Sequence, residues 1–232
     1  MRAGFFVAGT DTGVGKTRAT CALLRAAGQL GYSTVGMKPV AAGFERRGDT
    51  WFNDDVEALV AASSVKVDRR LINPYALRSA IAPHIAAEQQ GVALRIPPIR
   101  AAFEGLAEQA DVVMVEGVGG FRVPLDASHD MADLAVALGL PVILVVGMRL
   151  GCLNHAILTL EAIRHRGLSL AGWVANDLGT EMAEFEANLA TLESHLGGPA
   201  LAVFPWSPDE DGESASRHVV LPRWRSRLGE SS

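Results

Sequence analysis

Short apolar segments recur along the chain, and stretches with helical spacing of apolar residues separate most of them. The apolar segments are predicted strands and cover residues 3–9, 33–38, 111–116, 141–147, 170–176 and 200–204. The helix-like stretches cover residues 16–30, 54–63, 99–109, 129–139, 153–166 and 182–195. Strands that alternate with helices indicate a mostly parallel sheet with helices on both faces. We therefore expect a single-domain, three-layer α/β/α fold that extends over residues 1–224.

Two parts of the chain depart from this alternation. Residues 64–98 contain several prolines and have weaker periodicity, so we expect an inserted excursion that covers the functional site. The segment after Ser207 is rich in Ser, Arg and acidic residues, and residues 225–232 have little to pack against. Fraying is expected for this C-terminal tail.

A glycine-rich loop joins the first predicted strand to the first predicted helix, and it ends in Gly15-Lys16-Thr17. Backbone N–H groups of such a loop hold nucleotide phosphates, with the lysine on the terminal oxygens and the threonine on Mg²⁺. The strict pattern requires Gly at position 10, where this chain has Thr10. A tight turn with a solvated Lys16 is the alternative, but the order of strand, loop and helix favours nucleotide binding and a phosphate-loop NTPase fold.

Further charged residues follow the ends of predicted strands, where ligands bind in open α/β sheets. Lys38 closes the second strand as a second cation, because a buried lysine needs an anion to neutralise it. Glu116 closes the 111–116 strand and is a candidate Mg²⁺ ligand. Asp54 and Asp55 precede a helix, and we expect Asp55 to be the ligand and Asp54 the helix cap.

Two other segments are candidates for ligand contacts. Asn176, followed by Asp177, ends the 170–176 strand, and its amide could present a donor and an acceptor to a purine, or the two residues could form a turn. The residues from Gly151 to Asn154 open a helix whose free N–H groups suit a carboxylate. Alternatively, Asn154 serves only as an N-cap.

Composition narrows the class of partner. The formal net charge of −5 argues against nucleic acid or a membrane surface as a partner, since both attract basic proteins. Cys21 and Cys152 are the two cysteines, and their separation indicates neither a disulfide framework nor a zinc site. No apolar run approaches the roughly 18 residues of a membrane span, and the N-terminus lacks a signal-peptide pattern. We expect a cytoplasmic protein.

Seven blocks of residues, in order, give the chain a close resemblance to the dethiobiotin synthetase family over residues 3 to about 206. The blocks are Gly-Thr-Asp-Thr-Gly-Val-Gly-Lys-Thr at 9–17, Lys-Pro-Val-Ala-Ala-Gly at 38–43, Asn-Pro-Tyr at 73–75, Ala-Pro-His at 82–84, Val-Glu-Gly-Val-Gly-Gly at 115–120, Gly-Cys-Leu-Asn-His-Ala at 151–156 and Gly-Trp-Val-Ala-Asn-Asp at 172–177. The family's loop also carries Thr where the strict pattern has Gly.

The resemblance implies an enzyme of biotin synthesis that closes a ureido ring on 7,8-diaminononanoate with CO₂ and ATP. A substrate amine would capture CO₂ as a carbamate, the carbamate would take the γ-phosphoryl group, and the second amine would displace phosphate. The resemblance assigns Lys16, Lys38 and Thr12 to the reacting groups. It assigns Mg²⁺ to Thr17, Asp55 and Glu116.

The remaining contacts are also implied by the resemblance. Nucleotide contacts fall to Gly13, Val14, Gly15, Arg18, Gly117, Gly119, Asn176, Asp177, Pro205, Trp206 and Ser207, with Asn176 at the adenine. Substrate contacts fall to Ala42 and to Gly151, Cys152, Leu153 and Asn154. The last four would come from the other subunit and meet the substrate carboxylate, which implies a homodimer.

Three residues depart from common family choices, and three other functions compete with this one. Family members often have Ser, Glu and Lys where this chain has Ala42, Gly13 and Arg149. These differences bear on the affinity for the substrate and on the geometry of contacts with its carboxylate. A related ATP-dependent amide ligase would normally carry a glutaminase domain with a nucleophilic Cys, for which this chain has no room. A nucleotide-dependent switch ATPase would carry a signature lysine where this chain has Asp11. The third alternative is a catalytically silent nucleotide-binding module, which the presence of Lys16, Thr17, Lys38 and Glu116 together disfavours.

Overall fold

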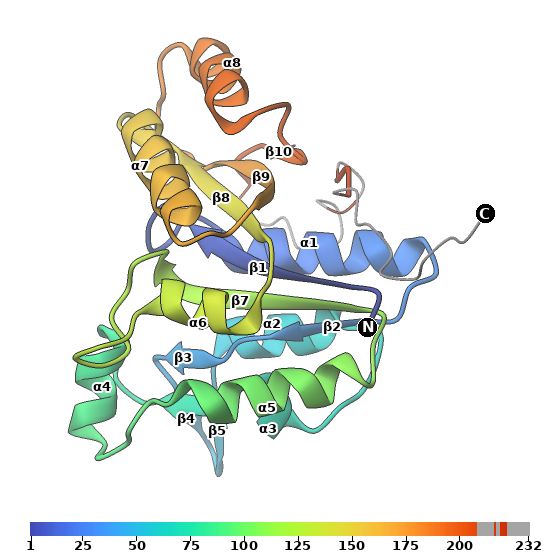
Figure 1. Cartoon of the computed structure of the whole chain (residues 1–232), viewed down its shortest axis with the longest axis vertical. Helices are drawn as coiled ribbons and strands as arrows, with labels where there is room; N and C mark the ends of the chain where they lie inside the picture. The colour runs from blue at the N-terminus through green and yellow to red at the C-terminus, as the bar shows by residue number, and fades with distance from the viewer. Residues whose placement is uncertain (208–215, 217–218, 222–232) are drawn as a thin grey trace.

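The computed structural model describes residues 1–207, 216 and 219–221, and its centre is a six-stranded parallel sheet (Figure 1). The strands lie in the order β10, β9, β8, β1, β7, β2, and each neighbouring pair is parallel. Their bounds are β1 Ala3–Gly9, β2 Thr34–Met37, β7 Val112–Gly120, β8 Val142–Met148, β9 Leu170–Asp177 and β10 Ala202–Phe204. The sheet and its parallel pairing confirm the predicted fold class.

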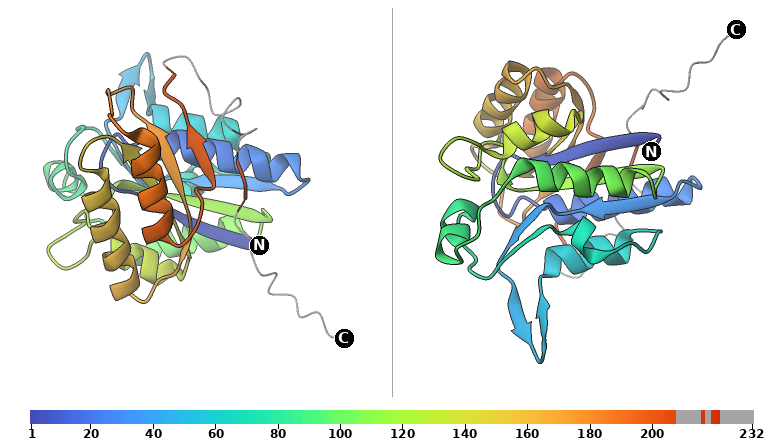
Figure 2. Two further views of the ribbon diagram at one scale, coloured as in Figure 1. Left: turned by 90° about the horizontal axis from the view of Figure 1, so that it is seen from above. Right: turned by 60° about the horizontal axis from the view of Figure 1, so that its bottom comes forward.

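Helices cover both faces of the sheet, which gives the three layers visible in Figure 2. One face packs against α1 (Lys16–Gln29) and α2 (Asp54–Ala62). The other face packs against α5 (Ile96–Ala107), α6 (Met131–Leu138), α7 (Cys152–His165) and α8 (Phe185–Leu196). The short helix α4 (Pro83–Gln89) joins this second layer through Ala86 and Ala87.

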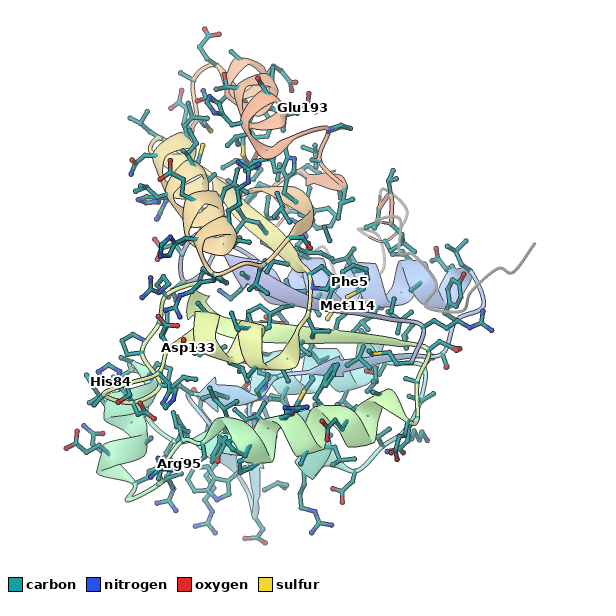
Figure 3. All side chains as sticks on the ribbon, in the orientation of Figure 1. Phe5, His84, Arg95, Met114, Asp133 and Glu193 are labelled. Carbon is teal, nitrogen blue, oxygen red and sulfur yellow. The ribbon has the colours of Figure 1, made fainter. Side chains whose placement is uncertain are left out.

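Alternation along β1 explains why its sequence is apolar throughout. Phe5 and Val7 belong to the core beneath α1, whereas Phe6 and Ala8 belong to the core on the opposite face. Successive side chains of a strand point to opposite faces, so a central strand needs apolar residues at every position. Figure 3 labels Phe5 beside Met114 of β7, its neighbour in the α1 core.

The predicted elements are all present, with shifts at their ends. Strand β7 continues past Glu116 to Gly120. Helix α5 begins at Ile96 because Pro97 and Pro98 fall in its first turn, where proline's missing N–H costs nothing. Helix α6 begins at Met131, after a capping box in which Asp130 and Asp133 bond each other's backbone N–H groups.

Several short elements between β2 and α5 have no counterpart in the predicted pattern. They are β3 (Val40–Ala42), β4 (Glu45–Arg47), β5 (Thr50–Phe52), α3 (Arg69–Ile72), β6 (Tyr75–Leu77) and α4. Strands β3 and β6 pair in parallel, and β4 and β5 form an antiparallel hairpin that projects from the body (Figure 2). Each strand has three residues, which is too short for periodicity to show.

The parallel order brings the carboxyl ends of the six strands to one edge of the sheet, where the predicted site residues follow. Among the helices of the described part of the chain, none is long and apolar enough to cross a membrane. The predicted domain end at 224 and the predicted frayed tail over 225–232 lie outside the described residues and stay predictions.

Candidate active site

The loop between β1 and α1 leads through a glycine into the uncapped start of α1. Gly15 precedes α1 with a φ of 89°, in the left-handed region that favours glycine. A Cβ at this position would lie 2.3 Å from Asn176 Nδ2, so a side chain would clash as well. No side chain caps α1 and its first turn holds no acidic residue, which leaves its N–H groups open to an anion.

Lys16 and Lys38 extend from two neighbouring parts of this edge. The Lys16 Nζ donates a hydrogen bond to the Asp11 carbonyl oxygen at 3.1 Å, so its side chain folds back over the loop. The Lys38 Nζ lies 2.5 Å from Glu116 Oε1 and 2.8 Å from Asp55 Oδ2. The predicted second cation therefore lies beside the loop and pairs with two carboxylates.

Thr17 completes this cluster of polar groups. Its hydroxyl oxygen lies 2.8 Å from both Asp55 Oδ1 and Glu116 Oε1. A hydroxyl has one proton, so it donates to one carboxylate at a time. Residues from α1, α2, β7 and the end of β2 thus converge on one point, although the chain separates Thr17 from Glu116 by 99 residues.

Burial and charge set the protonation of these groups. Burial by itself would lower the pKa of Lys38, which is 3% exposed, but the Glu116 and Asp55 carboxylates outweigh it and raise that pKa. Burial would likewise raise the pKa of Asp55, but Lys38 and the Thr17 hydroxyl outweigh it and lower that pKa. Burial and then Lys38 lower the pKa of Lys16 to about 8. An anion beside Lys16 would favour its charged form.

Glu116 provides the test of whether a metal ion fits here. It is 0% exposed, and its Oε2 atom is buried without a hydrogen-bond partner among the described residues. A buried carboxylate oxygen without a partner is costly unless a cation or donor meets it. Together with Thr17 and Asp55 it forms a set of hard oxygen ligands of the kind that Mg²⁺ prefers. The donor set therefore fits Mg²⁺.

A cavity of about 870 Å³ opens onto this cluster. Predicted site residues that line it are Thr12, Gly13, Gly15, Lys16, Thr17, Lys38, Ala42, Asp55, Glu116 and Gly119. Its far wall consists of residues 80–83 from the predicted excursion and of Val118, Arg122, Val123 and Pro124. The excursion thus covers the site over residues 80–83.

The other predicted nucleotide residues do not line this cavity. Asn176 is the second-last residue of β9 and pairs with Phe204 of β10, and its Nδ2 donates to the Val14 carbonyl oxygen at 3.1 Å. Asn176 and Asp177 both belong to β9, and Asn176 does not form a turn.

Trp206 is 54% exposed and lies against Gly179, where a Cβ would be 2.1 Å from the Trp206 Nε1. Asp177 accepts the Gly179 N–H at 2.9 Å. Gly117, in β7, packs against Phe6 of the neighbouring strand β1. Ser207 is the last residue of the continuously described part of the chain.

The predicted carboxylate residues do not line the cavity of their own chain. Gly151 is the N-cap of α7, without a side-chain cap, so the alternative in which Asn154 caps the helix is wrong. Cys152 is buried, which leaves its backbone as the part that can meet a ligand, whereas Asn154 is exposed. Arg149, just before α7, bonds Asp11 of the loop at 2.6 Å.

One prediction within the cluster is wrong. Asn53, and not Asp54, caps α2, because the Asn53 side chain accepts the Val56 N–H while the backbone of Asp54 is already helical. Asp54 instead lies 3.4 Å from Arg47 on the exposed hairpin. Arg122 and the ion pair of Asp11 with Arg149 were not predicted. The pair joins residues 138 apart, and nothing in the local sequence signals it.

Comparison with known proteins identifies the family. A model of an AAA domain family matches residues 3–214. The ATP-dependent dethiobiotin synthetase BioD of Aromatoleum aromaticum is 53% identical over 218 residues, which are 94% of this chain and 97% of that protein. The enzyme of the same name from Nitrosospira multiformis is 51% identical over 232 residues, 100% of this chain and 99% of that protein.

Solved structures show the fold at much lower identity. A ParA family ATPase from Chlorobium tepidum has a TM-score of 0.55 at 15% identity and covers 93% of this chain and 91% of its own. The septum site-determining protein MinD from Pyrococcus horikoshii has a TM-score of 0.52 at 16% identity, covering 88% and 82%. With a phosphate-loop NTPase fold and about half of its residues identical to these enzymes, the chain belongs to the ATP-dependent dethiobiotin synthetase family.

Proposed function

We propose that the protein closes the ureido ring of dethiobiotin from 7,8-diaminononanoate, CO₂ and ATP, releasing ADP and phosphate. One substrate amine attacks CO₂ and forms a carbamate with loss of a proton. A carbamate oxygen attacks the γ-phosphorus, and the bond to the ADP oxygen breaks. The second amine attacks the carbonyl carbon, and phosphate leaves with the carbamate oxygen. Both free cysteines are consistent with a cytoplasmic enzyme.

The single observation that supports this proposal is the charged cluster at the mouth of the cavity. Lys16 and Lys38 provide two cations, and Lys38 is held between Glu116 and Asp55. Phosphoryl transfer needs alignment and neutralisation of charge more than it needs a protein nucleophile. In this proposal Lys38 meets both the carbamate and the γ-phosphate, Lys16 meets the terminal phosphate oxygens, and Thr12 lines the same space.

Mg²⁺ would be held by Thr17, Asp55 and Glu116, and it would supply neutralisation of the phosphate charge when bound. The unpartnered Oε2 of Glu116 supports this assignment. The N–H groups of Gly13, Val14 and Gly15 and the start of α1 would hold the phosphates. Arg18, Gly117, Gly119, Asp177 and the Pro205–Ser207 segment would border the nucleotide, with the exposed Trp206 indole as an apolar face for the base.

The diamine would occupy the cavity between the cluster and residues 80–83, where Ala42 and Val118 supply apolar lining. We propose that its carboxylate meets the α7 N-terminus of a second subunit, at Gly151, Cys152, Leu153 and Asn154. Two observations support this: α7 begins without a side-chain cap or an acidic first turn, and these residues are absent from their own chain's cavity. The active form would then be a homodimer.

Replacing Asn154 with alanine is expected to raise the KM for 7,8-diaminononanoate about 10-fold, since one hydrogen bond to a charged group is lost. The KM for ATP should stay within a factor of two, because Asn154 does not line the phosphate side of the site. Arg164→Ala, at the exposed far end of α7, is the matched control. An equal rise of both KM values would remove Asn154 from the carboxylate site.

Mixing two inactive variants tests whether the site spans two subunits. Asn154→Glu places a negative charge beside the substrate carboxylate, and Lys38→Met disables the cluster of its own chain. In a mixed dimer, one site would combine an intact Lys38 with an intact Asn154 from the other chain. Activity should therefore reappear when the variants are refolded or co-expressed together. No recovery, with mixed dimers verified by mass, would place the whole site within one subunit.

The reaction itself is tested by following ADP and dethiobiotin with ATP, Mg²⁺ and bicarbonate, with and without the diamine. The proposal predicts that ADP release depends on the diamine and equals dethiobiotin formation, one to one. ADP release that ignores the diamine would instead support a switch ATPase, and ATP binding without any response to the diamine would support another ligase.

A further inference from the structure

Arg18, in the first turn of α1, contacts both segments that border the base side of the site. Its Nη1 donates hydrogen bonds to Asn176 Oδ1 and to the Pro205 carbonyl oxygen, each at 3.0 Å. Its guanidinium carbon lies 5.0 Å from the centroid of the Phe204 ring, which is fully buried. Because β9 and β10 pair at Asn176 and Phe204, the side chain bridges two neighbouring strand ends.

The bond from Arg18 leaves the Asn176 amide one orientation. Asn176 Oδ1 accepts from Arg18, while its Nδ2 donates to the Val14 carbonyl oxygen at 3.1 Å. A guanidinium can only donate and a carbonyl can only accept. Turning the amide by 180° would set its NH₂ group against the guanidinium and its oxygen against the Val14 oxygen. The side chain is only 5% exposed, so water cannot readily compensate.

An amide with fixed orientation distinguishes two classes of purine. After the two bonds above, Asn176 retains one lone pair on Oδ1 and one N–H on Nδ2. Adenine offers an N6–H donor and the N7 acceptor on one edge, which matches this pair. A 6-oxo purine offers two acceptors, O6 and N7, so one of them would face Oδ1.

We propose that Arg18 is a positioning residue that fixes the Asn176 amide and thereby makes the site select 6-amino over 6-oxo purine nucleotides. This inference rests on the proposed function, in which Asn176 meets the base. Without Arg18, only the Val14 carbonyl oxygen opposes turning of the amide, because the stronger, charge-assisted bond is gone. Loss of Arg18 should therefore improve 6-oxo nucleotides relative to ATP.

The test compares ATP with inosine triphosphate (ITP), which carries a 6-oxo group and lacks the 2-amino group of guanine. Kd values for both nucleotides are measured by calorimetry without diamine, and kcat/KM values with it. The wild type should prefer ATP, and in Arg18→Met the preference should fall at least about 10-fold, the loss expected for one charge-assisted hydrogen bond. Arg18→Lys, whose ammonium also only donates, should keep most of the preference.

A merely structural role for Arg18 would weaken both nucleotides equally and leave their ratio unchanged, which would overturn the inference. Arg100→Met is the control, because Arg100 pairs with Glu104 on the exposed side of α5. The binding measurement separates this inference from the proposed reaction. Selective ATP binding without dethiobiotin formation would contradict the reaction alone, whereas an unchanged ratio in an active enzyme would contradict the role of Arg18 alone.

Discussion

Replacing Lys38 with methionine is expected to lower kcat for dethiobiotin formation about 10³-fold, the range measured when a group that stabilises a transition state is removed. The reason is that Lys38 is the ammonium held at the cavity mouth by Glu116 and Asp55. The KM for ATP should change far less, because Lys16 and the N–H groups of the loop remain. Steady-state kinetics with both substrates measure this split.

Stability must be separated from catalysis in this experiment. Removing Lys38 leaves Glu116 buried without its charged partner, which costs about 3–5 kcal/mol in typical buried pairs. The double variant Lys38→Met with Glu116→Gln should regain much of that stability in denaturant unfolding and remain inactive. The chain has one other lysine besides Lys16 and Lys38, the exposed Lys66, and Lys66→Met is the matched control. Near-normal turnover in Lys38→Met would remove Lys38 from the mechanism.

Replacing Gly15 with alanine is expected to weaken ATP binding about 100-fold, the loss expected when a steric clash of about 1–3 kcal/mol is added to backbone strain. The new Cβ would lie 2.3 Å from Asn176 Nδ2, so either the loop or the base-side amide must move. The positive φ adds a conformational cost of about 1–2 kcal/mol for any residue with a Cβ. Calorimetric titration with ATP measures the loss of affinity.

Gly13 provides the matched control, because it shares the unusual backbone conformation without the clash. Its φ is 74°, yet a Cβ there would meet nothing within 4 Å. Gly13→Ala should therefore show only the conformational cost, and its ATP affinity should fall about 10-fold or less. Similar losses in both variants would mean that strain, and not contact with Asn176, explains the need for glycine at position 15.

Sequence patterns predicted the sheet and the central cluster because both depend on local features. The strands are apolar runs, and the loop ends in Gly15-Lys16-Thr17 directly before a helix. Lys38 and Glu116 could be placed together because parallel strands end at one edge of the sheet. Asp55 was predicted over Asp54 as the Mg²⁺ ligand; its contacts with Thr17 and Lys38 place it in the cluster, and its role as a ligand stays a prediction.

Other features depend on side-chain geometry that no local pattern encodes. Asn53 and Asp54 are both good helix caps, and only the backbone at the start of α2 shows that Asn53 has that role. The hairpin strand at Glu45–Arg47 contains no apolar residue, so periodicity could not reveal it. The bonds of Arg18 to Asn176 and of Arg149 to Asp11 join residues 158 and 138 positions apart.

The most direct test of the central claim, that the charged cluster transfers the γ-phosphoryl group to a carbamate, follows oxygen atoms. The reaction is started with ¹⁸O-labelled bicarbonate in unlabelled water and stopped before CO₂ exchanges its oxygens. One ¹⁸O atom is expected in each phosphate released and one in the ureido carbonyl of dethiobiotin. Phosphate without label, formed together with ADP, would mean that water attacks ATP, and it would contradict the account.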